Sequence, residues 1–285
     1  MKNKMHTPVF LQTVLEALAV RPDGKYIDGT AGEGGHLGKI AEQGATVLGI
    51  DYDRDQIERL ITGGFGNKVT LVHGNFRDIA RIAQTHGFTA VDGILLDLGL
   101  SYRQLRDKGI GLSYRNADEP LLMRLYDDNG TTAAQVLNHE SAGDLIRMLV
   151  KNAEEPYAAE IVEEVLIRRR QAPLKTVGDL LEIITSVSRR NRVNAEATAA
   201  RVFQALRMRV NEEMENLECA MHDAVELLRP GGRLVVITFH SLEDRYVKLF
   251  GKNTPGLKAI RFQVRSKDRA RFERSAQLRV FEKQK

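Results

Sequence analysis

Apolar residues follow two different patterns along the chain. In the first hundred residues, short continuous apolar runs alternate with stretches that have apolar residues at helical spacing. Continuous apolar runs are typical of parallel strands that are buried on both faces, and their alternation with helices predicts a doubly wound parallel α/β sheet. The expected strands are 25–28, 45–51, 69–73 and 91–98, and the expected helices are 37–43, 54–61 and 76–85.

From about 131 to 228 the spacing is helical almost throughout. Thr176 followed by Asp179 resembles a capping box and predicts a helix start. Residues 194–228 are expected to form one long helix that ends before Pro230 and the two glycines that follow it. Whether this helix is broken is left open. A strand is then expected at 233–239, a helix at 241–250, and strand-like stretches at 258–264 and 277–281. The simplest organisation is an α/β domain of residues 1–104 and 206–285, interrupted by a helical insertion at 105–205.

Composition narrows the class of protein. Hydrophobic residues make up 42% of the 285 positions and charged residues 28%, which indicates a globular chain. A single cysteine, Cys219, excludes a disulfide framework and a multi-cysteine zinc cluster, and no metal is expected. No run approaches the roughly 20 apolar residues of a membrane span, and residues 1–10 lack the features of a signal peptide. We therefore expect a cytoplasmic protein that does not enter a membrane.

The charge is unevenly distributed. Residues 251–285 hold eleven Lys and Arg against three Asp and Glu, which leaves the remainder of the chain mildly acidic although the whole carries +4. A basic tail suggests a polyanionic partner, and the alternative is a solvated tail that only aids solubility. Further candidate phosphate contacts are the clusters 168–170 and 189–190.

A glycine-rich turn lies between the first expected strand and the first expected helix. It reads DGTAGEGGH over residues 28–36. Glycines let the backbone approach a ligand, and the helix start offers free N–H groups. The ligand can be a dinucleotide or another adenosine compound, but the glycines do not keep the G-x-G-x-x-G register of a dinucleotide site. The acid at Asp28 suits the cationic S-adenosylmethionine better than a diphosphate.

Four residues end or follow the expected strands. Asp28, Asp51 and Asp97 end three of them, and Phe76 follows the remaining one. Ligands of open α/β sheets bind beyond the carboxyl ends of the strands. Asp51 is placed to accept ribose hydroxyls and Phe76 to stack on adenine. The alternatives are that Asp28 and Asp51 only form turns and that Phe76 belongs to the core.

Seven segments spread over nearly the whole chain form a recognisable set, namely DGTAGEGGH, GIDYD, GNF, GILLDLGLSYRQL, FQALRMRVNEEM, PGGRLVVITFHSLEDRYVK and RSAQLR. Together they resemble the RsmH (MraW) family of bacterial 16S ribosomal RNA cytosine-N4 methyltransferases. The resemblance implies a class I methyltransferase core with an inserted helical domain that recognises the substrate, S-adenosylmethionine as cofactor, and small-subunit rRNA or the 30S subunit as partner. A homodimer is left open.

Carried over by motif, the resemblance implies that seven residues contact the cofactor, namely Gly34, Gly35, His36, Asp51, Phe76, Asp97 and Gln104. The chain departs from the family pattern at Tyr102, at Arg106 and in the segments 108–114, 121–126 and 152–156. The cofactor half thus keeps the family motifs better than the segments that are expected to face the substrate.

Two residues are candidates for the chemistry. The N4 amine of cytosine is a weak nucleophile, so a hydrogen-bond acceptor near N4 is expected, and Asp97 is assigned that role together with a role in holding the cofactor. His240 is expected at the active-site rim, in contact with base or phosphate. Ser241 is expected to cap the following helix, with Asp244 completing a capping box.

The leading hypothesis is an S-adenosylmethionine-dependent enzyme that methylates N4 of a cytidine in the decoding region of 16S rRNA. Such an enzyme needs single-stranded RNA or an extruded base. The alternatives are a non-catalytic RNA-binding or ribosome-assembly factor with the same fold, and an N4-cytosine methyltransferase that acts on another RNA or on DNA.

Overall fold

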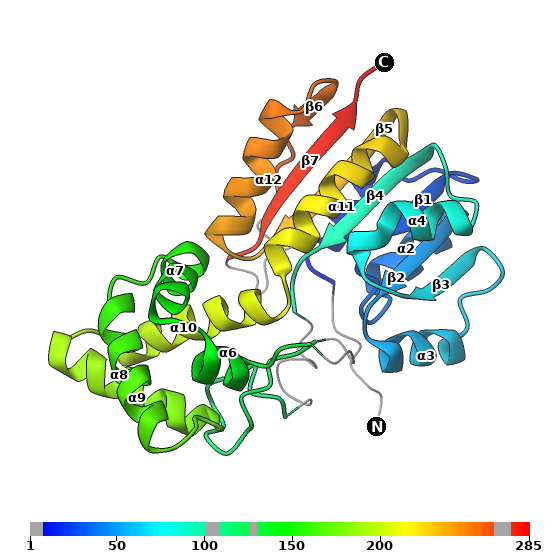
Figure 1. The fold of residues 1–285 in the computed structure, drawn as a ribbon. Helices are drawn as coiled ribbons and strands as arrows, with labels where there is room; N and C mark the ends of the chain where they lie inside the picture. The colour runs from blue at the N-terminus through cyan, green and yellow to red at the C-terminus, as the bar shows by residue number, and fades with distance from the viewer. Residues whose placement is uncertain (1–7, 101–108, 126–129, 265–274) are drawn as a thin grey trace. The chain divides into compact units, whose positions relative to one another are not determined.

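The computed structural model describes residues 8–100, 109–125, 130–264 and 275–285, drawn as a coloured ribbon in Figure 1. The chain divides into two compact units. Unit 1 comprises residues 1–99 and 214–285, and unit 2 comprises residues 100–213. The division falls near 100 and 213, whereas the sequence pattern suggested 105 and 205.

Unit 1 is built on a seven-stranded sheet (Figure 1). The strands are β1 (Lys25–Asp28), β2 (Thr46–Asp51), β3 (Val69–His73), β4 (Val91–Asp97), β5 (Leu228–Thr238), β6 (Leu257–Ile260) and β7 (Gln277–Lys283). They lie in the order β3-β2-β1-β4-β5-β7-β6. The first five in this order are parallel, and β7 runs antiparallel to both β5 and β6. The predicted doubly wound sheet is confirmed.

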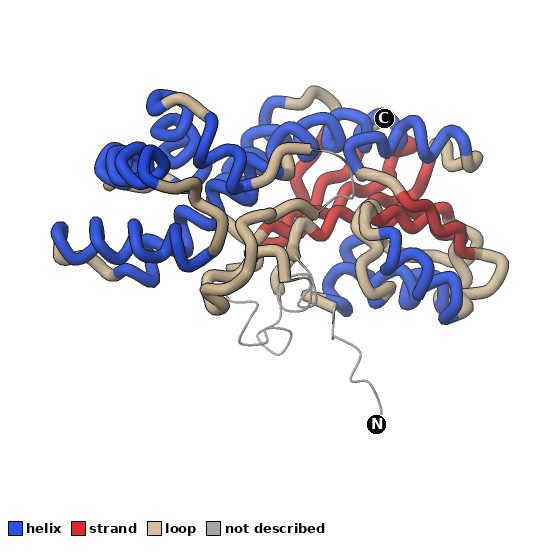
Figure 2. The backbone as a smooth tube through the Cα atoms, turned by 60° about the horizontal axis from the view of Figure 1, so that its bottom comes forward, coloured by secondary structure: helices blue, strands red, loops and turns tan. Residues whose placement is uncertain are grey.

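Helices cover both faces of this sheet, as Figure 2 shows for the red strands between blue helices. They are α1 (Leu11–Leu18), α2 (Gly35–Glu42), α3 (Arg54–Gly63), the 3-10 turn η1 (Phe76–Asp78), α4 (Ile79–Thr85), α11 (Glu213–Leu227) and α12 (Ser241–Asn253). On β4, Ile94 packs on one face with α4, α11 and α12, and Leu95 packs on the other face with α1, α2 and α3. Burial on both sides explains why the central strands are apolar at successive positions.

The differences from the expected elements have local causes. Residues 76–85 form η1 followed by α4, because the Asn75 side chain accepts a hydrogen bond from the Arg77 amide and starts a separate turn. The helix α1 was not expected. β5 begins at Leu228, and its pairing with β4 skips from Leu228 to Arg233. Pro230, which was expected to end the preceding helix, therefore lies inside an irregular strand.

Unit 2 is helical in its described part. Its helices are α6 (Ala133–His139), α7 (Ala142–Ala153), α8 (Ala158–Gln171), α9 (Val177–Asn191) and α10 (Ala195–Val210). The predicted start at Thr176 is confirmed as a capping box with Asp179. The long helix expected over 194–228 is two helices, because the chain breaks after α10 and Glu212 has a positive φ of 49°.

Candidate functional site

The carboxyl ends of the parallel strands form one edge of the sheet in unit 1. Asp28 ends β1 and pairs in register with Gly49 of β2 and Leu95 of β4. Asp51 and Asp97 each lie two residues beyond those partners, at the ends of their own strands. The three acids predicted from the sequence therefore end neighbouring strands at the same edge, which we call the carboxyl edge.

The glycine-rich turn joins this edge to α2. Its start is pinned by two hydrogen bonds, from the Gly29 amide to the Leu95 carbonyl at 2.9 Å and from the Ala31 amide to the Ile50 carbonyl at 2.8 Å. Gly34, the N-cap of α2, has φ of 80°, and a Cβ there would lie 2.6 Å from the Leu60 side chain. Both facts require glycine at this position.

Gly35 begins α2 and is required for a different reason. A Cβ at this position would lie 2.2 Å from Cγ of Pro8. The glycine therefore allows the segment before α1 to pack closely on the start of α2. The structure thus gives the predicted cofactor glycines Gly34 and Gly35 a packing role of their own.

Backbone amides hold the Asp51 carboxylate in place. The Gly32 amide donates to its Oδ2 at 2.7 Å, and the Asp53 amide donates to its Oδ1 at 2.8 Å. The side chain is 6% exposed. Each oxygen has further lone pairs, so the fixed carboxylate can still accept hydroxyl donors. The turn-forming role considered from the sequence is thus present, and it is compatible with ribose recognition.

Asp97 lies beside the buried imidazole of His36. The distance between His36 Nε2 and Asp97 Oδ2 is 3.7 Å, which is longer than a hydrogen bond. Neither ring nitrogen of His36 makes a hydrogen bond of ordinary geometry within the described residues. Burial lowers the pKa of His36 to about 4. The backbone of Val9 acts to raise this pKa, but by less than burial lowers it. His36 is therefore neutral at physiological pH. Asp97 is held separately, because its backbone amide donates to Thr30 Oγ1 at 2.7 Å.

Asp28 is almost completely enclosed, at 1% exposure. Burial raises its pKa to about 7, a hydrogen bond from the Thr30 amide lowers it, and the charge of Asp51 raises it. The Thr30 amide donates to Oδ1 at 3.2 Å. Asp28 thus stabilises the turn as a carboxyl that is partly protonated at neutral pH, and it adds less negative charge to the edge than expected.

Phe76 starts η1, just after β3. Its side chain is partly buried and packs against the core cluster that includes Ile79 and Ile82 of α4. This contact with the core agrees with the alternative considered for it, while stacking on adenine stays a prediction. Gln104 lies outside the described residues, as do positions 102, 106 and 108 and residues 265–274 of the basic tail.

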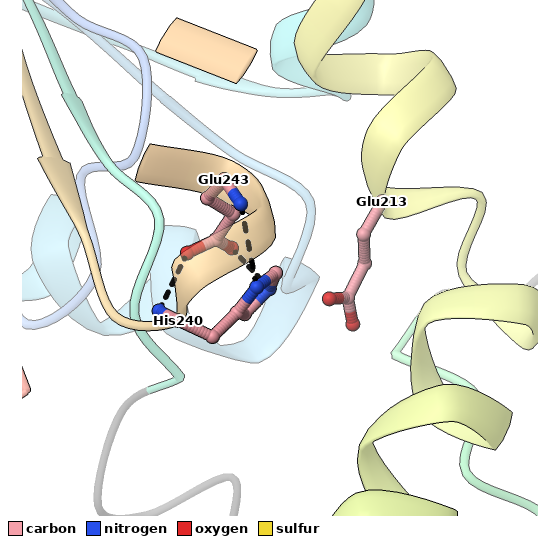
Figure 3. A group of neighbouring side chains, drawn as sticks. All are labelled: Glu213, His240 and Glu243. Atoms are coloured by element: carbon pink, nitrogen blue, oxygen red, sulfur yellow. Dashed lines mark hydrogen bonds and ion pairs between the residues drawn. The ribbon is translucent and has the colours of Figure 1, made fainter. Parts of the chain in front are cut away.

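His240 is the N-cap of α12, which corrects the expected cap. Its Nδ1 accepts from the Glu243 amide at 3.4 Å, and Glu243 Oε2 accepts from the His240 amide at 3.3 Å (Figure 3). Glu243 Oε2 also accepts from the Phe239 amide at 2.8 Å. His240 Nε2 lies 3.0 Å from Glu243 Oε1. The assignment of the cap to Ser241 and Asp244 is wrong, because the helix begins at Ser241, one residue earlier than that assignment requires.

Asp244 has a different partner. Arg279 of β7 donates to both carboxylate oxygens, at 2.7 and 2.8 Å. This pair ties α12 to the antiparallel strand.

Glu213, also drawn in Figure 3, belongs to unit 2, where it pairs with Arg207 at 2.7 Å.

Sequence reasoning missed two residues of this region. Thr30 fixes the Asp97 amide and Glu243 closes the cap of α12. His240 and Glu243 are three positions apart, as the two residues of a capping box are, and this spacing could have revealed the role of Glu243. Nothing in the sequence pairs Thr30 with Asp97, because that contact depends on the order of the strands.

The described residues fit S-adenosylmethionine. Three of the buried polar atoms without a hydrogen-bond partner among the described residues, Asp28 Oδ2 and both His36 nitrogens, lie at the carboxyl edge. Buried polar groups of native proteins nearly always have a partner. Carboxylates that accept hydrogen bonds suit ribose hydroxyls, an ammonium group and a neighbouring sulfonium. The same set of acids would repel a diphosphate.

Comparisons with known proteins agree with this chemistry. A family model described as the MraW methylase family matches residues 3–266. A protein of Thermomicrobium roseum named "Ribosomal RNA small subunit methyltransferase H" is 46% identical, over 86% of this chain and 76% of that protein. The protein of the same name from Heliobacterium mobile is 42% identical, over 86% of this chain and 80% of that protein.

Among solved structures, an rRNA methylase from Streptococcus thermophilus overlays with a TM-score of 0.45 at 10% identity, over 96% of this chain and 95% of that one. None of the helices in the described part of the chain is long and apolar enough to span a membrane.

The strand order, with β7 antiparallel between β5 and β6, is that of a class I methyltransferase. Unit 1 carries the glycine turn and acidic strand ends of a methyltransferase that uses S-adenosylmethionine. The chain belongs to the MraW methylase family.

Proposed function

We propose that the chain methylates N4 of a cytidine in the decoding region of 16S rRNA, in the cytoplasm, with the 30S subunit or its RNA as partner. The observation that carries this proposal is the match of nearly the whole chain to the MraW methylase family and to relatives named for the ribosomal RNA of the small subunit. Unit 2 is proposed to recognise the RNA.

The carboxyl edge of unit 1 is proposed to hold the cofactor. Asp51 binds the ribose hydroxyls through a carboxylate that Gly32 and Asp53 already fix. Phe76 contacts the adenine, and the turn around Gly34 and Gly35 contacts the cofactor through its backbone. When bound, S-adenosylmethionine supplies an electrophilic methyl group.

Asp97 is proposed to act on the substrate amine. Its carboxylate accepts a hydrogen bond from the N4 amine, which localises the nitrogen lone pair and stabilises the positive charge that develops there. The same carboxylate then takes the proton that N4 loses. His36 is neutral and 3.7 Å away, so it adds no positive charge that would weaken Asp97 as an acceptor.

His240 is proposed to contact the RNA from the start of α12, in addition to capping that helix. The cap uses Nδ1, and Nε2 lies 3.0 Å from Glu243 Oε1. An RNA contact requires the ring to leave that carboxylate or to share its Nε2 proton.

A deletion strain tests the proposal. We expect N4-methylation of the decoding-region cytidine to disappear from 16S rRNA when the gene is deleted, to return with the wild-type gene, and not to return with Asp97→Ala. Mass spectrometry of the nucleosides measures the mark. If the mark survives the deletion, the rRNA assignment is wrong. Restoration by Asp97→Ala would favour a non-catalytic assembly role, and loss of the same mark from another RNA would favour a different substrate.

The homodimer left open by the sequence is tested separately. Light scattering coupled to size-exclusion chromatography compares the mass of the species in solution with the 32.0 kDa of one chain. A mass of twice that value is the result expected of a dimer.

A further inference from the structure

The side chain of Thr30 lies between the two acids that end β1 and β4. Its Oγ1 accepts from the Asp97 amide at 2.7 Å. Burial raises the pKa of Asp28 to about 7, and hydrogen bonds from the amide and from the hydroxyl of Thr30 act against that rise. A hydrogen bond that lowers the pKa of a carboxyl is one donated to its charged form. The Thr30 hydroxyl therefore donates to Asp28 and accepts from Asp97.

The Asp97 amide points toward β1 at a level that β1 no longer reaches. The next amide along β4, that of Leu98, donates to the Ile237 carbonyl of β5 at 3.0 Å. Successive amides of a strand point to opposite sides, so the Asp97 amide faces the β1 side. β1 ends at Asp28, and the chain then enters the glycine-rich turn. The Thr30 hydroxyl takes the place of the carbonyl that a longer β1 would supply.

The backbone on both sides of Thr30 is held by the sheet. The Gly29 amide donates to the Leu95 carbonyl at 2.9 Å, and the Ala31 amide donates to the Ile50 carbonyl at 2.8 Å. These bonds fix the hydroxyl within the protein itself, so it is a rigid support for its partner. A shift of the Asp97 backbone requires breaking the bond to Thr30 and leaves an amide without its acceptor, which is costly.

This hydrogen bond also joins the two halves of the proposed reaction. The turn that contains Thr30 leads into Gly34 and Gly35, which are proposed to contact the cofactor. Asp97 is proposed to accept a hydrogen bond from the substrate amine, and its side chain leaves the same residue whose amide Thr30 binds. The placement of the carboxylate relative to the methyl donor therefore depends on one hydroxyl at the junction of the turn and β4.

We propose that Thr30 is a positioning residue for methyl transfer, because its hydroxyl holds Asp97 in place against the turn that binds the cofactor. This inference rests on the proposed function, in which Asp97 acts on the substrate amine. Methyl transfer from a sulfonium is an in-line displacement, and a misplacement of about 1 Å can lower the rate of such a step about 100-fold. Loss of the hydroxyl should thus lower the rate of methyl transfer more than the affinity for the cofactor.

The first experiment measures the single-turnover rate on small subunits from the deletion strain, at saturating S-adenosylmethionine. Thr30→Val keeps the shape but removes the hydroxyl, and we expect the rate to fall about 10- to 100-fold. Thr30→Ser keeps the hydroxyl and should stay within about threefold of the wild type. Thr46→Val, at the start of β2 on the opposite edge of the sheet, is the matched control and should also stay within about threefold.

Calorimetry with S-adenosylmethionine accompanies each rate. The number of binding sites gives the folded fraction of each variant, so that rates are compared per folded molecule. The affinity of Thr30→Val for the cofactor should stay within about threefold of the wild type, since the backbone of the turn is held by other bonds. Thr30→Ala is prepared beside Thr30→Val and replaces it in both experiments if the valine variant does not fold.

The second experiment repeats the substitution without the Asp97 side chain. Because Thr30 is proposed to act through that carboxylate, Thr30→Val should lower the rate of Asp97→Ala less than about threefold further. If Thr30 only stabilised the turn, the substitution would lower the rate by the same factor in both backgrounds. The comparison thus separates positioning of Asp97 from a purely structural role.

Three results overturn the inference. The first is a rate of Thr30→Val, per folded molecule, within about threefold of the wild type. The second is a Thr30→Ser variant as slow as Thr30→Val, and the third is an equal loss with and without the Asp97 side chain. The proposed function fails separately, if the wild type does not methylate these small subunits. An active wild type beside an equally active Thr30→Val contradicts the inference alone.

Discussion

The carboxyl edge of unit 1 and the buried Asn211 of unit 2 use hydrogen bonds between side chain and backbone in opposite ways. At the edge, backbone amides donate directly to the carboxylate of Asp51, so a charged side chain is fixed by the backbone. In unit 2, the Asn211 side chain accepts from the Leu125 amide and donates to the Met123 carbonyl, so the backbone is fixed by a neutral side chain. The first arrangement prepares a charged acceptor for a small ligand, and the second holds a segment of the chain in one conformation.

Removing the carboxylate of Asp97 is expected to have the largest effect at the carboxyl edge. Asp97→Asn keeps the shape of the side chain but loses its charge and its capacity to take a proton. We expect the single-turnover rate of methyl transfer to fall about 10²- to 10⁴-fold. Cofactor affinity should change less than tenfold, which calorimetry measures. A rate within threefold of the wild type would exclude a catalytic role for Asp97.

Asp51→Ala should affect the cofactor and not the RNA. Loss of a fixed acceptor for the ribose hydroxyls is expected to weaken S-adenosylmethionine binding about 10- to 100-fold, as for a charged hydrogen-bond partner. RNA affinity should remain within twofold. Asp55→Ala, an exposed acid on α3, is the matched control. Equal losses of cofactor and RNA affinity would show that the two functions are not separated between the units.

Asp28 predicts a pH dependence of stability. Burial raises its pKa to about 7, so the folded state keeps a proton that an unfolded carboxyl loses near pH 4. The stability from this proton is fully present below about pH 4 and is lost as the pH rises through about 7. Asp28→Asn stays neutral, so its free energy of unfolding relative to the wild type should rise between pH 4 and pH 8 by about 4 kcal/mol.

Urea denaturation of both proteins without cofactor measures this difference. A gap between the two that does not change with pH would contradict the buried, protonated carboxyl. It would instead place Asp28 in a solvated turn, as one reading of the sequence suggested.

His240→Asn separates the cap of α12 from an RNA contact. Asparagine is a good N-cap, so the free energy of unfolding should stay within about 0.5 kcal/mol of the wild type. The proposed contact predicts that methylation of small subunits falls about tenfold, mainly through a higher KM. Unchanged activity would reduce the role of His240 to capping.

Much of the carboxyl edge could be predicted from the sequence, because parallel topology dictates it. Once 25–28, 45–51 and 91–98 read as parallel strands, Asp28, Asp51 and Asp97 had to end at the same edge. The physical state of these groups could not be predicted. Whether Asp28 is protonated depends on its enclosure by α2 and the turn, which no local pattern records.

The contacts of Asn211 could not be predicted for a related reason. Asn211 hydrogen-bonds to residues 86 and 88 positions earlier in the chain, and a polar residue at the end of α10 reads as an ordinary helix end. The cap at His240 was missed by one position, because Ser is the commoner N-cap and histidine was assigned to function.

One measurement tests the central claim most directly. Small subunits from the deletion strain are incubated with purified protein and S-adenosylmethionine that carries a deuterated methyl group, and the nucleosides of the 16S rRNA are analysed by mass spectrometry. We expect the label in N4-methylcytidine of the decoding region with the wild type and its absence with Asp97→Asn. Label in another nucleoside, or none with the wild type, would contradict it.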